Sequence, residues 1–168
     1  LVGSEMCIRD RNSHHTVAIG TWEGDKQQSI EYNSSIAVGI DCPRAKLRVS
    51  ILLDTIQEYQ VRYIFSDEEI SEAVNEAGLI IGARGIAYEG VLQRKPVIVV
   101  GEYGFGGLVT PDTLHEQYNN YFRGKINGIK AEYFSLERLE EEIRRGFALT
   151  FQELQMMSNQ TIRFLHNI

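Results

Sequence analysis

The sequence predicts an α/β fold in which a parallel sheet is flanked by crossover helices. Two observations lead to this class. From Thr16 onward, short apolar runs alternate with amphipathic stretches, as in consecutive βαβ units. Between two of these runs, Ser66 and Glu69 have the spacing of a helix-capping box, which marks one of the crossovers.

We expect the strands at five apolar runs that turn residues separate. These are TVAIG (16–20), LRVSILLD (47–54), VRYIF (61–65), LIIGA (79–83) and PVIVVG (96–101). The intervening segment 25–39 is compatible with a helix, although Asn33 weakens its apolar face.

The clearest predicted helix covers 67–77, where one apolar face ends at Gly78. A short helix is expected at 86–94. Two more close the chain, one capped by Ser135 and one by a second capping box at Thr150 and Glu153. We expect their inner positions to be Leu136, Leu139, Ile143 and Phe147 in the first, and Phe151, Leu154, Met157, Ile162 and Leu165 in the second.

Two segments have no clear periodicity. GEYGFGG (101–107) reads as a glycine-rich loop, and residues 110–134 are polar and aromatic. For the second segment we favour packing under the last helices over a lid that covers a site.

Composition excludes several classes of function. A net charge of −6 argues against a nucleic-acid-binding or anionic-membrane surface. With Cys7 in the tail described below, Cys42 stands alone, so the sequence predicts neither a disulfide framework nor a cysteine metal site. His14 and His15 read as tail, and no other cluster has metal-ligand spacing. A reducing cytoplasm is the expected compartment.

The first ten residues mix apolar and charged side chains without any period. Leu1 to Asp10 can be back-translated into CTC GTG GGC TCG GAG ATG TGT ATA AGA GAC, which is similar to a commonly used transposase sequencing adapter. We therefore expect residues 1–11 to be an adapter-derived or disordered tail, and the chain to be a fragment. The remainder divides into an expected domain at 12–150 and a C-terminal helix, 151–168, that packs on it.

The segment IIGARGIAYEG (80–90) is the candidate ligand site, because in open α/β sheets ligands bind beyond the carboxyl ends of the strands. Gly82 and Gly85 allow the backbone to turn and to approach a ligand closely. The free N–H groups at the start of the following helix suit a phosphate. Arg84 could neutralise a diphosphate, or could be a solvated loop charge.

Glu89 lies about one turn into the same helix. Its carboxylate could accept hydrogen bonds from ribose hydroxyls beyond the phosphate. The alternative is an ordinary helix-face carboxylate that pairs with Arg94 or Lys95.

The order of these motifs resembles a known domain. TWEGDK, LRVSILLD, VRYIFSDEEISEAVNEAGLIIGARGIAYEG, KPVIVVG and GGLVTP together resemble the C-terminal, nucleotide-sugar-binding domain of GT-B glycosyltransferases. The resemblance covers 16–111 well and the closing helices 136–168 loosely. It implies a Rossmann-like parallel sheet with flanking helices, as the C-terminal half of a two-domain architecture whose N-terminal acceptor domain is missing here.

The resemblance also implies roles for particular residues. The donor's diphosphate would lie on the backbone of Gly85, Ile86 and Ala87, with Glu89 holding the ribose. Further donor contacts would come from Lys26, Arg84, Gly106 and Gly107. One large branch of the family has an arginine where this chain has Thr21, and an acidic residue where it has Ile81. The sequence therefore departs from the standard pattern of that branch.

The expected function is hexosyl transfer from a UDP- or GDP-type nucleotide sugar to an unknown acceptor, in glycan or polysaccharide biosynthesis. The resemblance implies no metal and no cofactor, and the negative net charge argues against a nucleic-acid partner. The missing domain would supply the acceptor base and any contact with the inner face of the membrane, so this chain alone should be inactive and its catalytic residues are unknown. The alternatives are a UDP-sugar 2-epimerase-like enzyme and a non-catalytic nucleotide-binding domain of the same fold.

Overall fold

The computed structural model describes residues 8–10, 14–23, 26–33, 35–125, 129–130 and 133–166, and up to residue 33 it describes the backbone alone. The strands are β1 (Ile8–Asp10), β2 (His14–Glu23), β3 (Lys26–Asn33), β4 (Ser35–Gly39), β5 (Gln60–Tyr63), β6 (Leu79–Gly82), β7 (Val97–Gly101) and β8 (Gly104–Leu108). The helices are α1 (Pro43–Ile56), α2 (Ile70–Glu76), α3 (Gly85–Leu92), α4 (Leu114–Asn119), α5 (Leu136–Phe147) and α6 (Phe151–His166), and a 3-10 turn, η1 (Asp67–Glu69), precedes α2.

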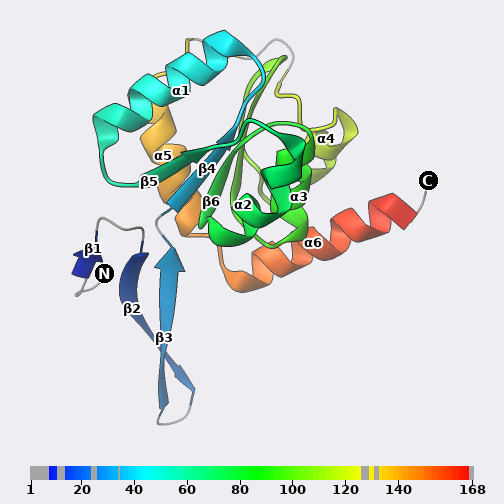
Figure 1. The fold of residues 1–168 in the computed structure, drawn as a ribbon. Coiled ribbons are helices and arrows are strands. Elements are labelled where there is room, and N and C mark those ends of the chain that lie inside the picture. Colours follow the sequence, from blue (N-terminus) through cyan, green and yellow to red (C-terminus); the bar gives the residue numbers. More distant parts are fainter. Residues whose placement is uncertain are drawn as a thin grey trace.

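A five-stranded sheet with the order β5-β4-β6-β7-β8 forms the centre of the molecule (Figure 1). The first four of these strands are parallel, and β8 runs antiparallel to β7. Helices cover both faces of the sheet. The predicted α/β class is therefore confirmed, and the architecture is compatible with a Rossmann-like fold.

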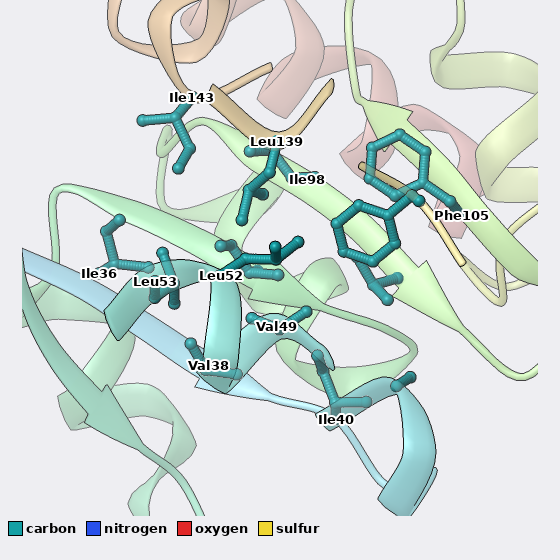
Figure 2. Packing of buried hydrophobic residues seen from close by; sticks show 14 of the residues in the cluster. Ile36, Val38, Ile40, Val49, Leu52, Leu53, Ile98, Phe105, Leu139 and Ile143 are labelled. Atoms are coloured by element: carbon teal, nitrogen blue, oxygen red, sulfur yellow. The ribbon is translucent and has the colours of Figure 1, made fainter. Parts of the chain in front are cut away.

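Alternating side chains of the central strands divide the core into two layers. Ile36 and Val38 of β4 face the layer under α1 and α5, which Figure 2 shows from close by. Ala37, between them, faces the layer under α2, α3 and α6. Because both faces are buried, β6 and β7 are apolar throughout and β4 is apolar after Ser35, as expected for a parallel sheet.

The prediction of a strand at 47–54 is wrong, because this segment lies inside α1. Leu47, Val49, Ile51 and Leu53 alternate with other residues as in a strand, yet only Val49 and Leu53 are buried, whereas Leu47 and Ile51 are 62% and 50% exposed. Pro43 occupies the first helical turn, where a proline is well tolerated.

The segment 25–39, which the sequence left compatible with a helix, forms strands in its described residues, β3 over 26–33 and β4 over 35–39. The first strand of the parallel sheet is therefore β4 and not TVAIG. TVAIG does form a strand, but it belongs to β2 in a separate antiparallel sheet of the order β1-β2-β3. In Figure 1 the β2–β3 hairpin projects away from the five-stranded sheet.

The glycine-rich segment 101–107 is mostly strand and not loop. A tight turn at 102–103 joins β7 to β8, and the two strands pair antiparallel. Within β8, Gly107 adopts a φ of +78°, which an L side chain rarely adopts. The sequence prediction missed β8 because glycine is depleted in strands.

The other helix predictions are largely confirmed. The segment 67–77 contains η1 and α2, with Ser66 Oγ accepting a hydrogen bond from the Glu68 N–H at 3.2 Å. Ser135 caps α5 by accepting from the Arg138 N–H. In α6 the predicted inner position Met157 is buried, but Phe151 is 68% exposed, so the buried face is rotated from the one that the apolar residues suggested.

Candidate functional site

A pocket of about 240 Å³ opens at the carboxyl ends of the central strands. Its walls come from the loops that follow β4, β6 and β7. The lining residues are Gly39, Asp41, Cys42, Ala83, Arg84, Gly101 and Glu102. The pocket lies where the chain order of the sheet reverses, with β5 on one side of β4 and β6 on the other. Ligands of open α/β sheets bind at this kind of switch point.

Two glycines allow the ends of β4 and β6 to come together below the pocket. A Cβ atom at Gly82 would lie 2.5 Å from the backbone oxygen of Gly39. One at Gly39 would lie 2.7 Å from Cδ1 of Ile86 at the start of α3. Side chains at either position would push the helix away from the sheet, so these glycines place the α3 N-terminus at the pocket.

The turn before α3 places Arg84 beside the pocket. Arg84 has φ 55° and ψ −123°, an uncommon conformation for a residue with a side chain, and its N–H donates to the Phe122 carbonyl at 3.1 Å. The Gly85 position is open, because no heavy atom lies within 4 Å of a Cβ built there. The first N–H groups of α3 have no partner within the helix, so they are available to an anion.

Glu102 is the centre of the charged cluster at the pocket. Its Oε1 atom accepts hydrogen bonds from Nε of Arg84 at 3.1 Å and from Nη2 of the same side chain. The Nε atom of Arg123 lies 3.4 Å from the same oxygen. The hydrogen bond and the charge of Glu102 raise the pKa of Arg84 above its ordinary value, so Arg84 stays cationic.

Aromatic rings flank the second arginine. The guanidinium carbon of Arg123 lies 5.7 Å from the ring centroids of both Tyr103 and Tyr121. Its Nη1 donates to the Tyr103 hydroxyl at 3.1 Å. These contacts hold the guanidinium group close to Glu102.

Arg84 is the predicted site residue whose side chain lines the pocket, and the α3 N-terminus of Gly85, Ile86 and Ala87 lies next to it. Glu89 is not among the lining residues. Its carboxylate accepts a hydrogen bond at 2.8 Å from Gln93, whose amide also donates to the Ser71 carbonyl. Glu89 therefore faces α2, and the structure does not bring it to the pocket.

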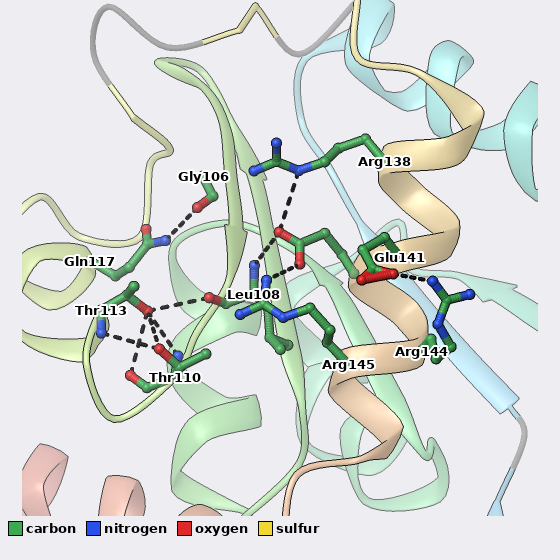
Figure 3. Close-up of polar contacts among 10 residues, drawn as sticks. Gly106, Leu108, Thr110, Thr113, Gln117, Arg138, Glu141, Arg144 and Arg145 are labelled. Carbon is green, nitrogen blue, oxygen red and sulfur yellow. Dashed lines mark hydrogen bonds and ion pairs between the residues drawn. The ribbon is translucent and has the colours of Figure 1, made fainter.

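The remaining predicted residues lie elsewhere. Gly106 and Gly107 are in β8, where the Gly106 carbonyl accepts from the Gln117 amide at 2.8 Å (Figure 3). A Cβ atom at Gly107 would lie 2.8 Å from Oε1 of Glu142 on α5. Lys26 begins β3, opposite Glu23 of β2, and its side chain is outside the described part of the structure.

No protein-family model, curated protein or solved structure matches this chain. Across the described ranges, no group of three or more His, Cys, Asp or Glu side chains could hold a metal ion. No helix in the part of the chain that the structure describes has the length and apolar character needed to cross a bilayer.

The sequence prediction missed Asp41, Cys42 and Glu102. Asp41 and Cys42 follow β4, which the prediction had assigned to a helix, so their position at a strand end was hidden. Glu102 directly follows the correctly predicted strand PVIVVG. Its place at the carboxyl end of that strand was the signal that could have identified it.

Proposed function

We propose that this chain binds the diphosphate of a nucleotide-sugar donor in the switch-point pocket, as the donor-binding part of a glycosyltransferase. The observation that carries the proposal is the pocket itself. It combines a glycine-lined strand end, a helix N-terminus and the Arg84 guanidinium within one opening of about 240 Å³. Each of these features favours a phosphate group.

In this proposal the N–H groups of Gly85, Ile86 and Ala87 bind the phosphate oxygens, and Arg84 neutralises their charge. Such groups stabilise a diphosphate as it leaves the sugar, because negative charge then increases on its oxygens. The chemistry on the acceptor side would belong to a further domain. We therefore expect this chain to bind nucleotide and not to turn over a donor by itself.

Calorimetric titration with UDP and with GDP tests the proposal. We expect binding of at least one of them, and a loss of about tenfold or more in Arg84→Gln, because hydrogen bonds to charged groups are among the stronger ones. Arg144→Gln is the matched control, since Arg144 pairs with Glu141 on α5 and does not line the pocket. Absence of binding at millimolar nucleotide, or equal affinities for both variants, would overturn the proposal.

A non-catalytic nucleotide-binding domain is the second candidate, because the position of Glu89 departs from the glycosyltransferase pattern that the resemblance implies. A carboxylate held by Gln93 toward α2 is not placed to hold a ribose. If Glu89→Gln leaves UDP affinity unchanged while Arg84→Gln weakens it, the ribose role of Glu89 is excluded. A 2-epimerase would be recognised by its product, because it returns an isomeric nucleotide sugar without an acceptor.

A further inference from the structure

The oxygen Oε1 of Glu102 occupies a position between two arginines at the edge of the pocket. Arg84 directs Nε and Nη2 at this oxygen, which is the edge of a guanidinium group that binds carboxylates and phosphates in a fork. Arg123 approaches the same oxygen from a second side at 3.4 Å. A phosphate that binds either arginine must therefore displace the Glu102 carboxylate.

Arg123 has a donor atom that lacks a hydrogen bond. Its Nε atom is shielded from solvent and makes no hydrogen bond, so the ion pair with Glu102 is what compensates it. A shielded donor without a partner is costly, because it has lost water without a full replacement. An anion oxygen closer than 3.4 Å would satisfy this atom better than Glu102 does.

Contacts fix the backbone around this cluster, whereas the Glu102 carboxylate is accessible to solvent. The N–H of Tyr103 donates to the Arg123 carbonyl at 2.8 Å, and a Cβ atom at Gly101 would lie 2.5 Å from that carbonyl oxygen. The side chain of Glu102 itself is 45% exposed. Glu102 can therefore rotate away from the arginines while the backbone stays in place and Tyr103 and Tyr121 still flank the Arg123 guanidinium.

We propose that Arg123 is a second phosphate-binding residue of this site, and that the Glu102 carboxylate occupies the phosphate position until a ligand displaces it. The identity of the anion as a nucleotide diphosphate rests on the proposed function. Displacement is feasible, because an ion pair between exposed side chains contributes little stability. Glu102 then lowers the affinity of the pocket for every anion that uses this position.

Glu102→Gln tests the displacement step. We expect it to raise the affinity for inorganic pyrophosphate and for UDP by about two- to fivefold, because the exposed ion pairs of Glu102 with Arg84 and Arg123 are each weak. Titration calorimetry at constant ionic strength measures both. The matched control is Glu140→Gln, which removes the same charge from an exposed position on α5 and should leave both affinities unchanged.

Arg84→Gln and Arg123→Gln complete the test. Each should weaken pyrophosphate binding, and in the double variant the additional change Glu102→Gln should have no effect. A persistent effect would mean that Glu102 acts as a general negative charge, and would overturn the proposal. Thermal unfolding of each variant identifies any loss of fold, and Arg123→Lys, which keeps the charge, should then retain part of the affinity.

The two probes separate this inference from the proposed function. If Glu102→Gln binds pyrophosphate more tightly but no variant binds UDP, the displacement is supported and a nucleotide is rejected as the ligand. If the unmodified chain binds UDP and Glu102→Gln leaves that affinity unchanged or lowers it, the displacement by the ligand is rejected and the proposed function is not. If no variant binds either probe, both proposals fail.

Discussion

Glu142 is a carboxylate in the interior of the molecule, with a side chain that is only 2% exposed. Arg145 donates to Oε2 at 2.7 Å, and Nε of Arg138 lies 3.6 Å from Oε1 (Figure 3). The N–H of Leu108 in β8 also points at this carboxylate, at 3.5 Å. Charge and hydrogen bonds thus compensate the burial, and Glu142 connects α5 to the edge of the sheet.

We predict that Glu142→Ala lowers the free energy of unfolding by about 1–3 kcal/mol, because it removes a buried group and leaves its partners unpaired. Glu141→Ala is the control on the same helix. It breaks an exposed pair with Arg144 and should cost about 0–1 kcal/mol. Chemical denaturation measures both, and equal effects would contradict the structural role of Glu142.

Tyr88 on α3 has a raised pKa, chiefly because burial disfavours the phenolate and also because it interacts with Tyr118. Below about pH 10 the hydroxyl is protonated in both the folded and the unfolded chain. Above it, the unfolded chain ionises first, because its pKa is lower. The folded state therefore loses stability as pH rises from the unfolded pKa toward the folded one.

We predict that Tyr88→Phe reduces the loss of stability between about pH 9 and pH 11. The free energy of unfolding at a series of pH values measures the effect. Burial lowers the pKa of Lys95, which has the opposite effect on stability as pH rises. Lys95 is present in the unmodified protein and in Tyr88→Phe, so its contribution cancels when their free energies of unfolding are compared. Parallel curves for the two chains would contradict the prediction.

Among the elements, α6 has the best-defined start. The Thr150 N–H donates to the Glu153 carboxylate at 2.9 Å, and the Glu153 N–H donates to the Thr150 hydroxyl at 3.1 Å. This reciprocal pair is the capping box that the sequence predicts. At Ser66 the hydroxyl accepts from Glu68, while the Glu69 carboxylate lies 3.5 Å from Nη2 of Arg62, and the helix opens with a 3-10 turn.

Thr150→Ala should lower the free energy of unfolding by about 0.5–2 kcal/mol, which is the usual cost of a lost N-cap. Thr55→Ala serves as the comparison, because its exposed hydroxyl only donates back to the Ile51 carbonyl within α1. That change should stay within about 0.5 kcal/mol. Urea unfolding measures the free energy of unfolding of both variants. A smaller loss for Thr150→Ala than for Thr55→Ala would reject the capping role of Thr150.

The elements that were predicted wrongly had ambiguous local patterns. In α1 the apolar residues satisfy both a two-residue and a helical period, so the segment 47–54 could not be assigned from spacing. Several segments with a cap or a bounding glycine or proline were assigned correctly, including α5, α6, β6 and β7. The helix α1, which begins at Pro43, was not.

For the whole molecule, the end of the sheet at which a residue lies decides its role. β3 leads into the amino end of β4, whereas the pocket lies at its carboxyl end. Lys26 starts β3 opposite Glu23 of β2, at the end of β3 that is farthest along the chain from β4. The structure therefore gives no support to the phosphate contact that the resemblance implies for Lys26.

We predict that Lys26→Ala leaves the affinity for UDP unchanged. Arg84→Gln, measured in the same titration, is the positive comparison, because Arg84 lines the pocket. A tenfold loss of affinity in Lys26→Ala would show that the hairpin reaches the ligand.

The sequence by itself determined the α/β class, the caps of the last two helices and the turn at Gly82 to Gly85. These depend on local hydrogen bonding, on apolar runs and on backbone freedom, which neighbouring residues specify. Only the tertiary structure decided that 47–54 is a helix, that β8 closes the sheet and that Glu102 meets Arg84 and Arg123. The physical reasons differ: packing of Val49 and Leu53 into the core selects the helix, and pairing with β7 overrides the low strand propensity of the glycines in β8. The Glu102 cluster depends on charge contacts between separate loops, which no local pattern contains.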